Sequence, residues 1–166
     1  QRIPRGTEID SVPVEGTSCR FRTCGDVRLL PLALEMAEAE RPAGSAGHLK
    51  LVFRVAQGVK ADALDLSRLR LFLHGEPTTT YALFLQLTRR LKEIVVAPAG
   101  GGGRQVTLPP DSLKPAGIGD EDALIPYPPH SFPGYRLLQE YFALPQKFLF
   151  LDLEGLPRLG ALGATD

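Results

Sequence analysis

The sequence predicts an α+β domain of mostly antiparallel strands, sandwich-like or barrel-like, with two short helices. Three features of the sequence support this prediction. Apolar residues alternate with other residues along several short segments, which is the pattern of strands with one buried face. Two segments, near 78–92 and 132–143, instead place apolar residues every three to four positions, as amphipathic helices do. The 17 glycines and 15 prolines are dispersed, which indicates short elements joined by tight turns.

We expect three regions along the chain. Residues 1–16 contain two prolines and several charges, which predicts an extended linker or an edge strand. Residues 17–156 contain the segments with periodic apolar patterns and are expected to form a single α+β domain. Residues 157–166 are predicted to be a flexible tail. Because the chain begins at Gln1 without an initiator methionine, we expect it to be an internal fragment of a longer protein.

The segment 17–24 is the first predicted strand of the domain. Its cysteines, Cys19 and Cys24, are five positions apart and would point to opposite faces of a strand, so neither a disulfide between them nor shared metal binding is expected. Free cysteines are commonly buried, and we expect these two to be buried. The three histidines are isolated from one another and add no zinc-site spacing, so the sequence predicts no metal and no cofactor.

Alternating apolar residues indicate the next strands. Leu32, Leu34 and Met36 alternate, which favours a strand although several residues around them have high helix propensity. The clearest strand patterns lie at 48–56 and 69–73.

A change of period then predicts the first helix, over 78–92. Thr78, Thr79 and Thr80 are candidate N-cap residues. The apolar stripe of this helix consists of Tyr81, Leu83, Phe84, Leu87 and Leu91.

Four consecutive glycines at 100–103 lie between two short β-branched or apolar segments, 94–96 and 105–108, which predicts a hairpin with a flexible tip. A phosphate-binding loop is the alternative for such a run of glycines. That alternative is disfavoured because a phosphate loop needs a helix directly behind it, and here Pro109 and Pro110 follow closely.

The second helix, over 132–143, follows Ser131 as candidate N-cap and contains Pro133 in its first turn. The final strand, 148–153, is apolar on both faces, which predicts a central place in a sheet. We expect the helix to bury the stripe formed by Leu138, Tyr141 and Phe142.

The composition disfavours two kinds of partner. The chain has 19 basic and 19 acidic residues and no clustered basic surface of the kind that displaces counterions, so nucleic-acid binding is not expected. No apolar run approaches the roughly 20 residues that span a bilayer, so direct membrane insertion is not expected either.

The segment 131–142, with the sequence SFPGYRLLQEYF, is long and rich in aromatic residues. Together with Pro145 and the segment 147–153, it resembles the TssF family (also called VasA or ImpG) of type VI secretion baseplate subunits. Shorter matches lie in the family's order at 21–24, 71–76 and 124–127. The family's helical N-terminal region and its long C-terminal part have no counterpart in this sequence.

The resemblance implies a structural protein without catalytic activity in a bacterial, phage-tail-like machine. Members of this family form wedge complexes with TssG, help to connect TssK and TssE, and surround the VgrG spike hub. The resemblance therefore also implies a cytoplasmic location at the inner face of the bacterial envelope.

Four residues are candidates for a protein interface: Tyr127, Phe132, Tyr135 and Arg136. Aromatic and arginine side chains are frequent anchors at interfaces. For Tyr135 the sequence leaves open whether the ring meets a partner or fills the domain's own core. For Tyr141 its helical position favours the core.

Two other function classes are compatible with parts of the sequence. Paired carboxylates, Asp62 with Asp65 or Asp152 with Glu154, would suit hydrolysis, but solvated charges show the same spacing and no catalytic motif accompanies them. A β-rich module that binds carbohydrate or peptide is the alternative function, although the chain has no tryptophan for stacking on sugars.

Overall fold

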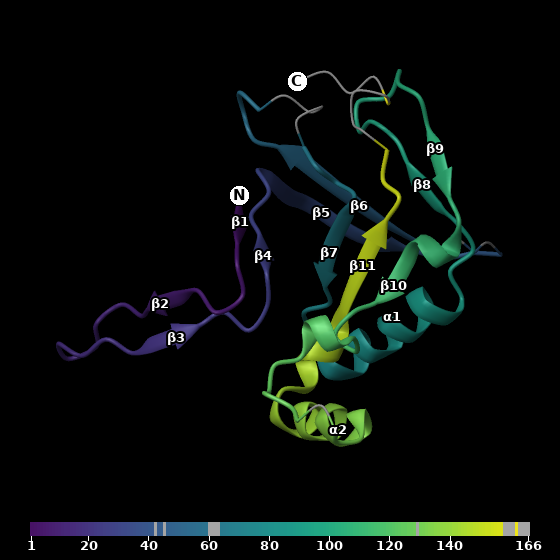
Figure 1. Ribbon diagram of the computed structural model, residues 1–166. Helices are drawn as coiled ribbons and strands as arrows, with labels where there is room; N and C mark the ends of the chain where they lie inside the picture. The colour runs from purple at the N-terminus through teal and green to yellow at the C-terminus, as the bar shows by residue number, and fades with distance from the viewer. Residues whose placement is uncertain (42, 45, 60–63, 129, 158–161, 163–166) are drawn as a thin grey trace.

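The computed structural model describes residues 1–41, 43–44, 46–59, 64–128, 130–157 and 162 (Figure 1). The strands and helices are β1 (Arg2–Ile3), β2 (Glu8–Asp10), β3 (Arg20–Arg22), β4 (Val27–Arg28), β5 (Leu32–Glu40), β6 (His48–Val55), β7 (Arg68–Phe72), α1 (Pro77–Arg89), β8 (Ile94–Val96), β9 (Val106–Leu108), β10 (Leu113–Pro115), α2 (Pro133–Ala143) and β11 (Phe150–Glu154). A 3-10 segment, Pro145–Leu149, links α2 to β11.

The centre of the fold is a three-stranded antiparallel sheet in the order β10-β11-β7. Its middle strand, β11, contains Leu151, which is completely buried. Helix α1 packs against β10, and α2 packs against the 3-10 segment that precedes β11. The buried apolar side chains of the described residues are Leu64, Leu66, Leu69, Leu108, Ala116, Leu149, Leu151 and Leu162. This core is small for the part of the chain that the structure describes.

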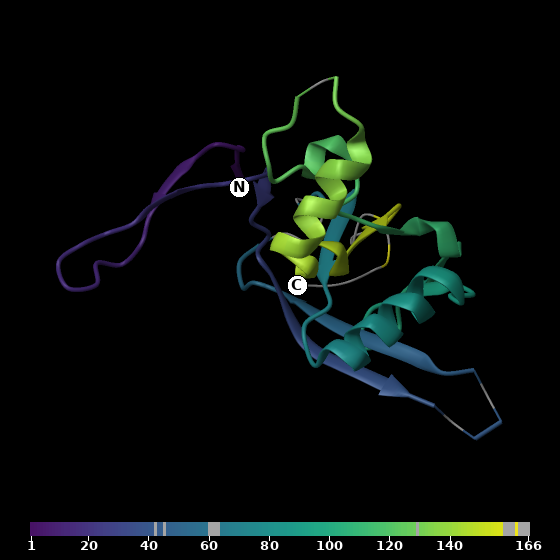
Figure 2. The ribbon, with the colours of Figure 1, turned by 90° about the horizontal axis from the view of Figure 1, so that it is seen from below.

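The remaining strands form separate two-stranded sheets: β1 with β4, β2 with β3, β5 with β6, and β8 with β9. Residues 1–28 make a narrow arm that projects from the rest of the molecule, as Figures 1 and 2 both show. The β5–β6 hairpin projects on another side (Figure 2). The described strands form five separate small sheets and no closed barrel, and residues such as Leu34, which is 55% exposed, are left uncovered. The α+β class with antiparallel strands and two helices is confirmed, without the closed barrel that was one form of the prediction.

The strands predicted from alternation are found as β5, β6 and β7, and the predicted hairpin is found as β8–β9. The last strand is central as predicted, but it begins at Phe150 because the preceding residues form the 3-10 segment. Residues 1–16, predicted to be a linker or an edge, contain β1 and β2. Of the tail predicted at 157–166, the structure describes only residues 157 and 162, so this prediction lies largely outside the described residues. The division of the chain into domains stays a prediction.

Three local predictions at the helix starts and at the cysteines are wrong. The N-cap of α1 is Glu76, whose carboxylate accepts hydrogen bonds from the backbone N–H groups of Thr78 and Thr79, both at 3.0 Å. These bonds lower the pKa of Glu76. The N-cap position of α2 is Phe132 rather than Ser131, and no side chain caps that end. Cys19 and Cys24 are exposed, because the arm that holds them has no packed interior.

Gly117 occupies a position that other residues cannot adopt without strain. Its φ is +89°, and a Cβ added there would lie 2.6 Å from the carbonyl oxygen of Lys147. The left-handed conformation and the close approach both require glycine. The turn at Gly117 therefore fixes the path of the segment that runs from β10 to α2.

We predict that Gly117→Ala lowers the free energy of unfolding by about 2–4 kcal/mol, because it adds a steric clash to the strain of a positive φ. Gly101→Ala is the matched control, since Gly101 has a φ of +72° and open space around its Cβ position. It should cost only about 1–2 kcal/mol. Urea unfolding of both variants measures the difference. Equal losses of unfolding free energy would show that the short distance between position 117 and the carbonyl oxygen of Lys147 has no effect.

Candidate protein interface

Helix α2 has the reverse of the usual burial pattern, with charged residues facing inward and apolar residues facing outward. Arg136 is 2% exposed and Glu140 is completely buried. The apolar side chains around them are exposed: Phe132 by 68%, Tyr135 by 65%, Leu138 by 56%, Tyr141 by 47%, Phe142 by 77% and Leu144 by 46%. We call these six residues the aromatic face. The prediction that Leu138, Tyr141 and Phe142 form a buried stripe is wrong.

Glu140 explains why the charged side of α2 faces inward. One of its carboxylate oxygens accepts hydrogen bonds from the backbone N–H groups of Leu124, at 2.7 Å, and Ile125, at 3.3 Å. The other oxygen accepts a hydrogen bond from the ammonium group of Lys147, and it lies 3.5 Å from the guanidinium of Arg136. Charged groups are buried only where such partners replace water. These contacts tie α2 to the 117–125 segment and to the 3-10 segment before β11.

Two opposing effects set the pKa of Glu140. Burial raises it, because the charged form loses its hydration. The hydrogen bond from Lys147 and those from the backbone N–H groups of Leu124 and Ile125 lower it, and they outweigh the burial. The result is a pKa below the ordinary value, so Glu140 is ionised at neutral pH.

Arg136 is held by the same segment. Its guanidinium donates to the carbonyl oxygen of Ile118, at 3.2 Å, and to the carboxylate of Asp120, at 3.1 Å. The buried Nε atom of Arg136 has no hydrogen-bond partner among the described residues. Arg136 therefore lies inside the fold, where it orients the helix and the loop rather than presenting itself at the surface.

A second set of ion pairs continues from this loop into the central sheet. Asp122 accepts hydrogen bonds from the backbone N–H of Gly117 and from the guanidinium of Arg70, both at 2.8 Å. Burial raises the pKa of Asp122, but these two bonds hold it below its ordinary value. Arg70 also binds Asp152 through two parallel hydrogen bonds of 2.8 and 2.7 Å, a strong bidentate pair. Helix α2 is thus joined to the 117–125 segment through Arg136 and Asp120, and that segment is joined to the central sheet through Asp122 and Arg70.

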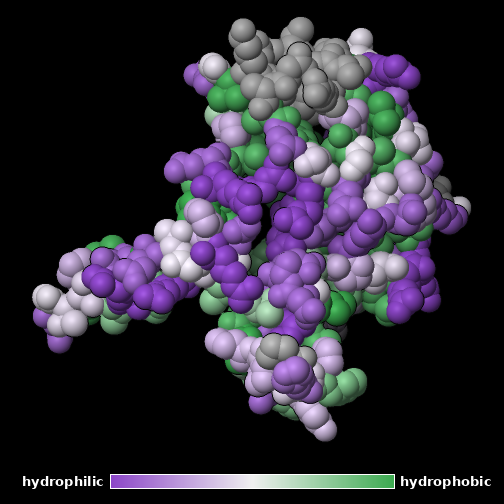
Figure 3. Space-filling view, viewed as in Figure 1, coloured by the Kyte–Doolittle hydropathy of each residue, from purple (hydrophilic) through white to green (hydrophobic). Residues whose placement is uncertain are grey.

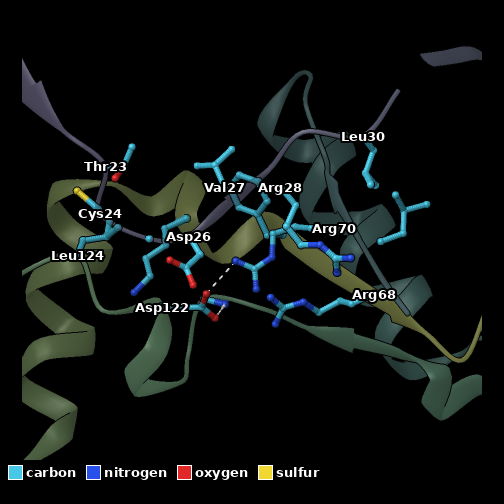
Figure 4. A pocket seen from close by; sticks show the side chains of 15 residues that line it. Thr23, Cys24, Asp26, Val27, Arg28, Leu30, Arg68, Arg70, Asp122 and Leu124 are labelled. Atoms are coloured by element: carbon cyan, nitrogen blue, oxygen red, sulfur yellow. Dashed lines mark hydrogen bonds and ion pairs between the residues drawn. The ribbon is translucent and has the colours of Figure 1, made fainter. Parts of the chain in front are cut away.

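A cavity of about 450 Å³ lies where the arm meets the body, between residues 23–28, strand β7 and the 117–124 loop. Figure 4 shows Arg28, Arg68, Arg70 and Asp122 among its lining side chains, and Figure 3 shows a hollow bordered by hydrophilic residues. The cations are already paired: Arg28 with Asp65, Arg70 with Asp122 and Asp152, and Lys147 with Glu140. No tyrosine lines the cavity, so it lacks the tyrosine–arginine cleft that would favour the carbohydrate-binding alternative.

The carboxylate pairs that were considered for hydrolysis are not arranged as an acid and a base. Asp152 binds Arg70, whereas Glu154 binds Lys114 at 2.6 Å. Asp65 binds Arg28, and Asp62 lies outside the described residues. Within the described part of the chain, no group of three or more metal-ligating side chains is close enough to hold an ion.

The four candidate interface residues are placed differently by the structure. The rings of Phe132 and Tyr135 are exposed and meet edge to face, with centroids 5.7 Å apart. Tyr127 is half-buried, and its hydroxyl is buried without a hydrogen-bond partner among the described residues; burial raises its pKa. Arg136 is buried. The prediction that all four contact a partner stays untested. Further exposed apolar residues of this region, which the prediction did not include, are Leu138, Tyr141, Phe142 and Leu144.

The sequence contains only a partial signal for the orientation of α2. Arg136 and Glu140 are four positions apart, the spacing at which opposite charges pair on a helix. Lys147 follows one short segment later and supplies the second cation. Because such pairs are usual on exposed helix surfaces, the spacing does not predict burial; the hydrogen bonds from Leu124 and Ile125 to Glu140 set the orientation, and the sequence does not reveal them.

Among the helices of the described residues, none is both long enough and apolar enough to cross a membrane. Small separate sheets, a small core among the described residues and an exposed aromatic helix face define the class of this chain as one that leaves apolar surface for further protein to cover.

The comparisons with known proteins identify the family. The family model described as "Type VI secretion system, TssF" matches residues 1–166, and the chain belongs to this family. The "Type VI secretion system component TssF1" of Pseudomonas aeruginosa is 39% identical over 160 residues, a match that covers 88% of this chain and 25% of the relative. The resemblance found in the sequence is therefore confirmed.

A solved structure agrees with this result. A chain of the type VI secretion system TssK-TssF-TssG baseplate subcomplex, determined by cryo-electron microscopy, matches with a TM-score of 0.77 and 31% sequence identity. The match covers 95% of this chain and 30% of that chain. The sequence thus spans between a quarter and a third of the proteins that it matches.

We predict that Glu140→Gln lowers the free energy of unfolding by about 3–5 kcal/mol, because it leaves the buried charges of Arg136 and Lys147 without their common partner. Glu154→Gln is the matched control, since it breaks the exposed pair with Lys114. Such a pair contributes less than about 1 kcal/mol. Urea unfolding at neutral pH measures both losses, and a Glu140→Gln loss as small as the control's would refute this role for Glu140.

We also predict that the stability difference between the unsubstituted chain and Glu140→Gln depends on pH. Because the pKa of Glu140 is lowered in the folded state, its contribution is fully present above the unfolded value of about 4.3. The contribution is lost as the pH falls through the lower, folded value. Urea midpoints measured from neutral pH down to acid should converge for the two proteins. A difference that stays constant with pH would show that Glu140 is not ionised in the fold.

Proposed function

We propose that this chain is a structural part of the type VI secretion baseplate and that the aromatic face of α2 is one of its contacts with other subunits. The observation that best supports the contact is the outward orientation of six apolar side chains, enforced by the burial of Arg136 and Glu140. A solved relative in the TssK-TssF-TssG subcomplex supports the assembly. Catalysis is no part of the proposed role.

The total surface of the chain supports a role in assembly. Its accessible surface is 12092 Å², whereas a compact monomer of 18.0 kDa has roughly 8,000 Å². The excess of about 4,000 Å² is surface that partner subunits, or the rest of a protein of which this chain spans a quarter to a third, can cover. The arm and the β5–β6 hairpin contribute to it, because both project from the body (Figures 1 and 2).

The proposed partners follow from the family. TssG and TssK are the first candidates, because both are named with TssF in the subcomplex that contains the solved relative. TssE and the VgrG spike hub are further proposed neighbours, and the proposed location is the cytoplasmic face of the bacterial envelope. In this role the chain helps to hold the wedges together around the hub.

The composition of the aromatic face suits such a contact. Tyrosine and phenylalanine provide large contact areas with few rotatable bonds, so little conformational entropy is lost when a partner covers them. Pairs of rings are already ordered against each other, Phe132 with Tyr135 and Tyr141 with Phe142, at centroid distances of 5.7 and 5.8 Å. The face is therefore largely preorganised for binding.

We predict that Tyr135→Ala combined with Phe142→Ala reduces the TssG and TssK that co-purify with the tagged protein by about tenfold or more, because both substitutions remove exposed aromatic anchors. Gln139→Ala, an exposed polar residue on the same helix, is the matched control and should leave co-purification unchanged. The protein at its full natural length is co-expressed with the other baseplate subunits of its source.

Two results would count against this proposal in different ways. Unchanged co-purification of the double variant would remove the aromatic face from the interface and leave the baseplate role intact. Failure of the unsubstituted protein to recruit any baseplate subunit would refute the assembly role itself. Circular dichroism of the variants establishes that any loss of binding is not a loss of folding.

A further inference from the structure

A groove lies beside helix α1, and none of its lining residues belongs to α2. Its volume is about 490 Å³, and it lies between the second half of α1 and residues 115–118. The lining residues are Phe84, Leu85, Thr88, Arg89, Pro115 and Ile118. Leu85 is 54% exposed and Ile118 is 53% exposed, so large apolar side chains border an open groove.

The hydroxyl group inside the groove, that of Thr88, needs no partner from a ligand. The hydroxyl of Thr88 donates a hydrogen bond of 2.8 Å to the carbonyl oxygen of Phe84 within the helix. A ligand in the groove therefore gains contact with apolar surface and leaves no polar atom of Thr88 unsatisfied. This favours an apolar ridge as the part of a partner that enters.

One end of the groove is basic. Arg89 lines the groove, and Arg90 and Lys92 follow it at the end of α1, all three with exposed side chains. None of them forms an ion pair with the described residues, whereas most other arginines of the described chain do. Glu93 is the acidic residue next to them in the sequence. The local charge is therefore positive and available to an acidic partner.

The neighbouring sheet edge argues against a partner that adds a strand. β10 is an edge strand of the central sheet, but it has only three residues and ends at Pro115, which has no backbone N–H to donate. Short edges that contain proline resist strand addition. A helix that lays an apolar ridge into the groove does not need backbone hydrogen bonds from this edge.

We propose that the α1 groove binds an amphipathic helix of another protein, with an apolar ridge seated between α1 and residues 115–118 and acidic side chains paired with Arg89 and Arg90. The apolar lining and the adjacent unpaired cations together define this chemistry. The surface is distinct from the aromatic face of α2. The proposal goes beyond the baseplate contact proposed above and does not depend on it.

The test uses a stapled helical peptide with leucine along one face and glutamate along the other, labelled with a fluorophore. The control peptide has lysine in place of every glutamate. Fluorescence anisotropy with the protein at its full natural length should show the glutamate peptide binding about tenfold tighter or more, with an affinity that falls as salt is added. Hydrogen exchange should slow in α1 when the glutamate peptide is bound.

Two variants locate the binding site. Leu85→Asp should weaken the glutamate peptide by about tenfold or more, because it places a charge in the apolar lining. Arg89→Glu combined with Arg90→Glu should remove the preference for glutamate over lysine. Arg104→Glu, an exposed arginine at the far end of the β8–β9 hairpin, is the control and should change neither. All the substituted side chains are exposed, so folding is expected to be retained.

Several outcomes would overturn the proposal. Equal affinity for the two peptides would refute the acidic component, and no binding of either would refute the groove as a helix site. Binding that survives Leu85→Asp would place the peptide elsewhere. Self-association of the protein that is abolished by Leu85→Asp would show that a second copy, and not another protein, occupies the groove.

Discussion

The buried carboxylate of Glu140 is the interaction on which the arrangement of the candidate interface depends. It receives two backbone N–H groups from the 124–125 segment, the ammonium of Lys147 and the nearby guanidinium of Arg136. Removing a partner from a buried ionised group is strongly destabilising, because the charge left behind is uncompensated. The rotation of α2 about its axis is thereby fixed, and with it the side of the helix that meets solvent.

The aromatic face is a consequence of this constraint as much as of its own residues. A helix with five bulky apolar residues in eleven positions would normally turn them toward the core. Here paired charges occupy the inner side of α2, and four of the five apolar residues remain exposed: Tyr135, Leu138, Tyr141 and Phe142. The free energy that their burial would release is therefore available to a contact with another subunit. This connects a local ionic arrangement to the proposed role in an assembly.

Much of the fold is accessible from the sequence, and the part that is not has a physical explanation. Periodicity predicts β6, β7, α1 and β11 because each has a one-sided or fully buried pattern. It fails for the buried side of α2, because hydrophobicity alone assigns Leu138, Tyr141 and Phe142 to the interior and ignores how three charges satisfy one another. It also fails for the arrangement of sheets, because alternation along β5 does not reveal whether a second layer covers Leu34. For the candidate site, the sequence offers Phe132 as an interface candidate, leaves Tyr135 open between core and surface, and does not predict the buried position of Arg136.

The arm formed by β1 to β4 has a mechanical consequence. Its two inner strands, β1 and β4, pair with each other only at Arg2–Arg28 and Ile3–Val27. Beyond the chain itself, the arm is joined to the body by hydrogen bonds from Arg28 to the carbonyl oxygen of Asp65, at 2.9 Å, and from Arg5 to that of Ala123, at 2.7 Å. Further out, the β2–β3 pair sets Ile9 opposite Phe21 on one face and ion pairs on the other, with no core behind either. Such a ribbon can swing or open without disturbing the sheet that holds β11. Unfolding of the outer arm would therefore expose few further apolar side chains, so its order would cost little to lose and little to restore when another surface covers Ile9 and Phe21.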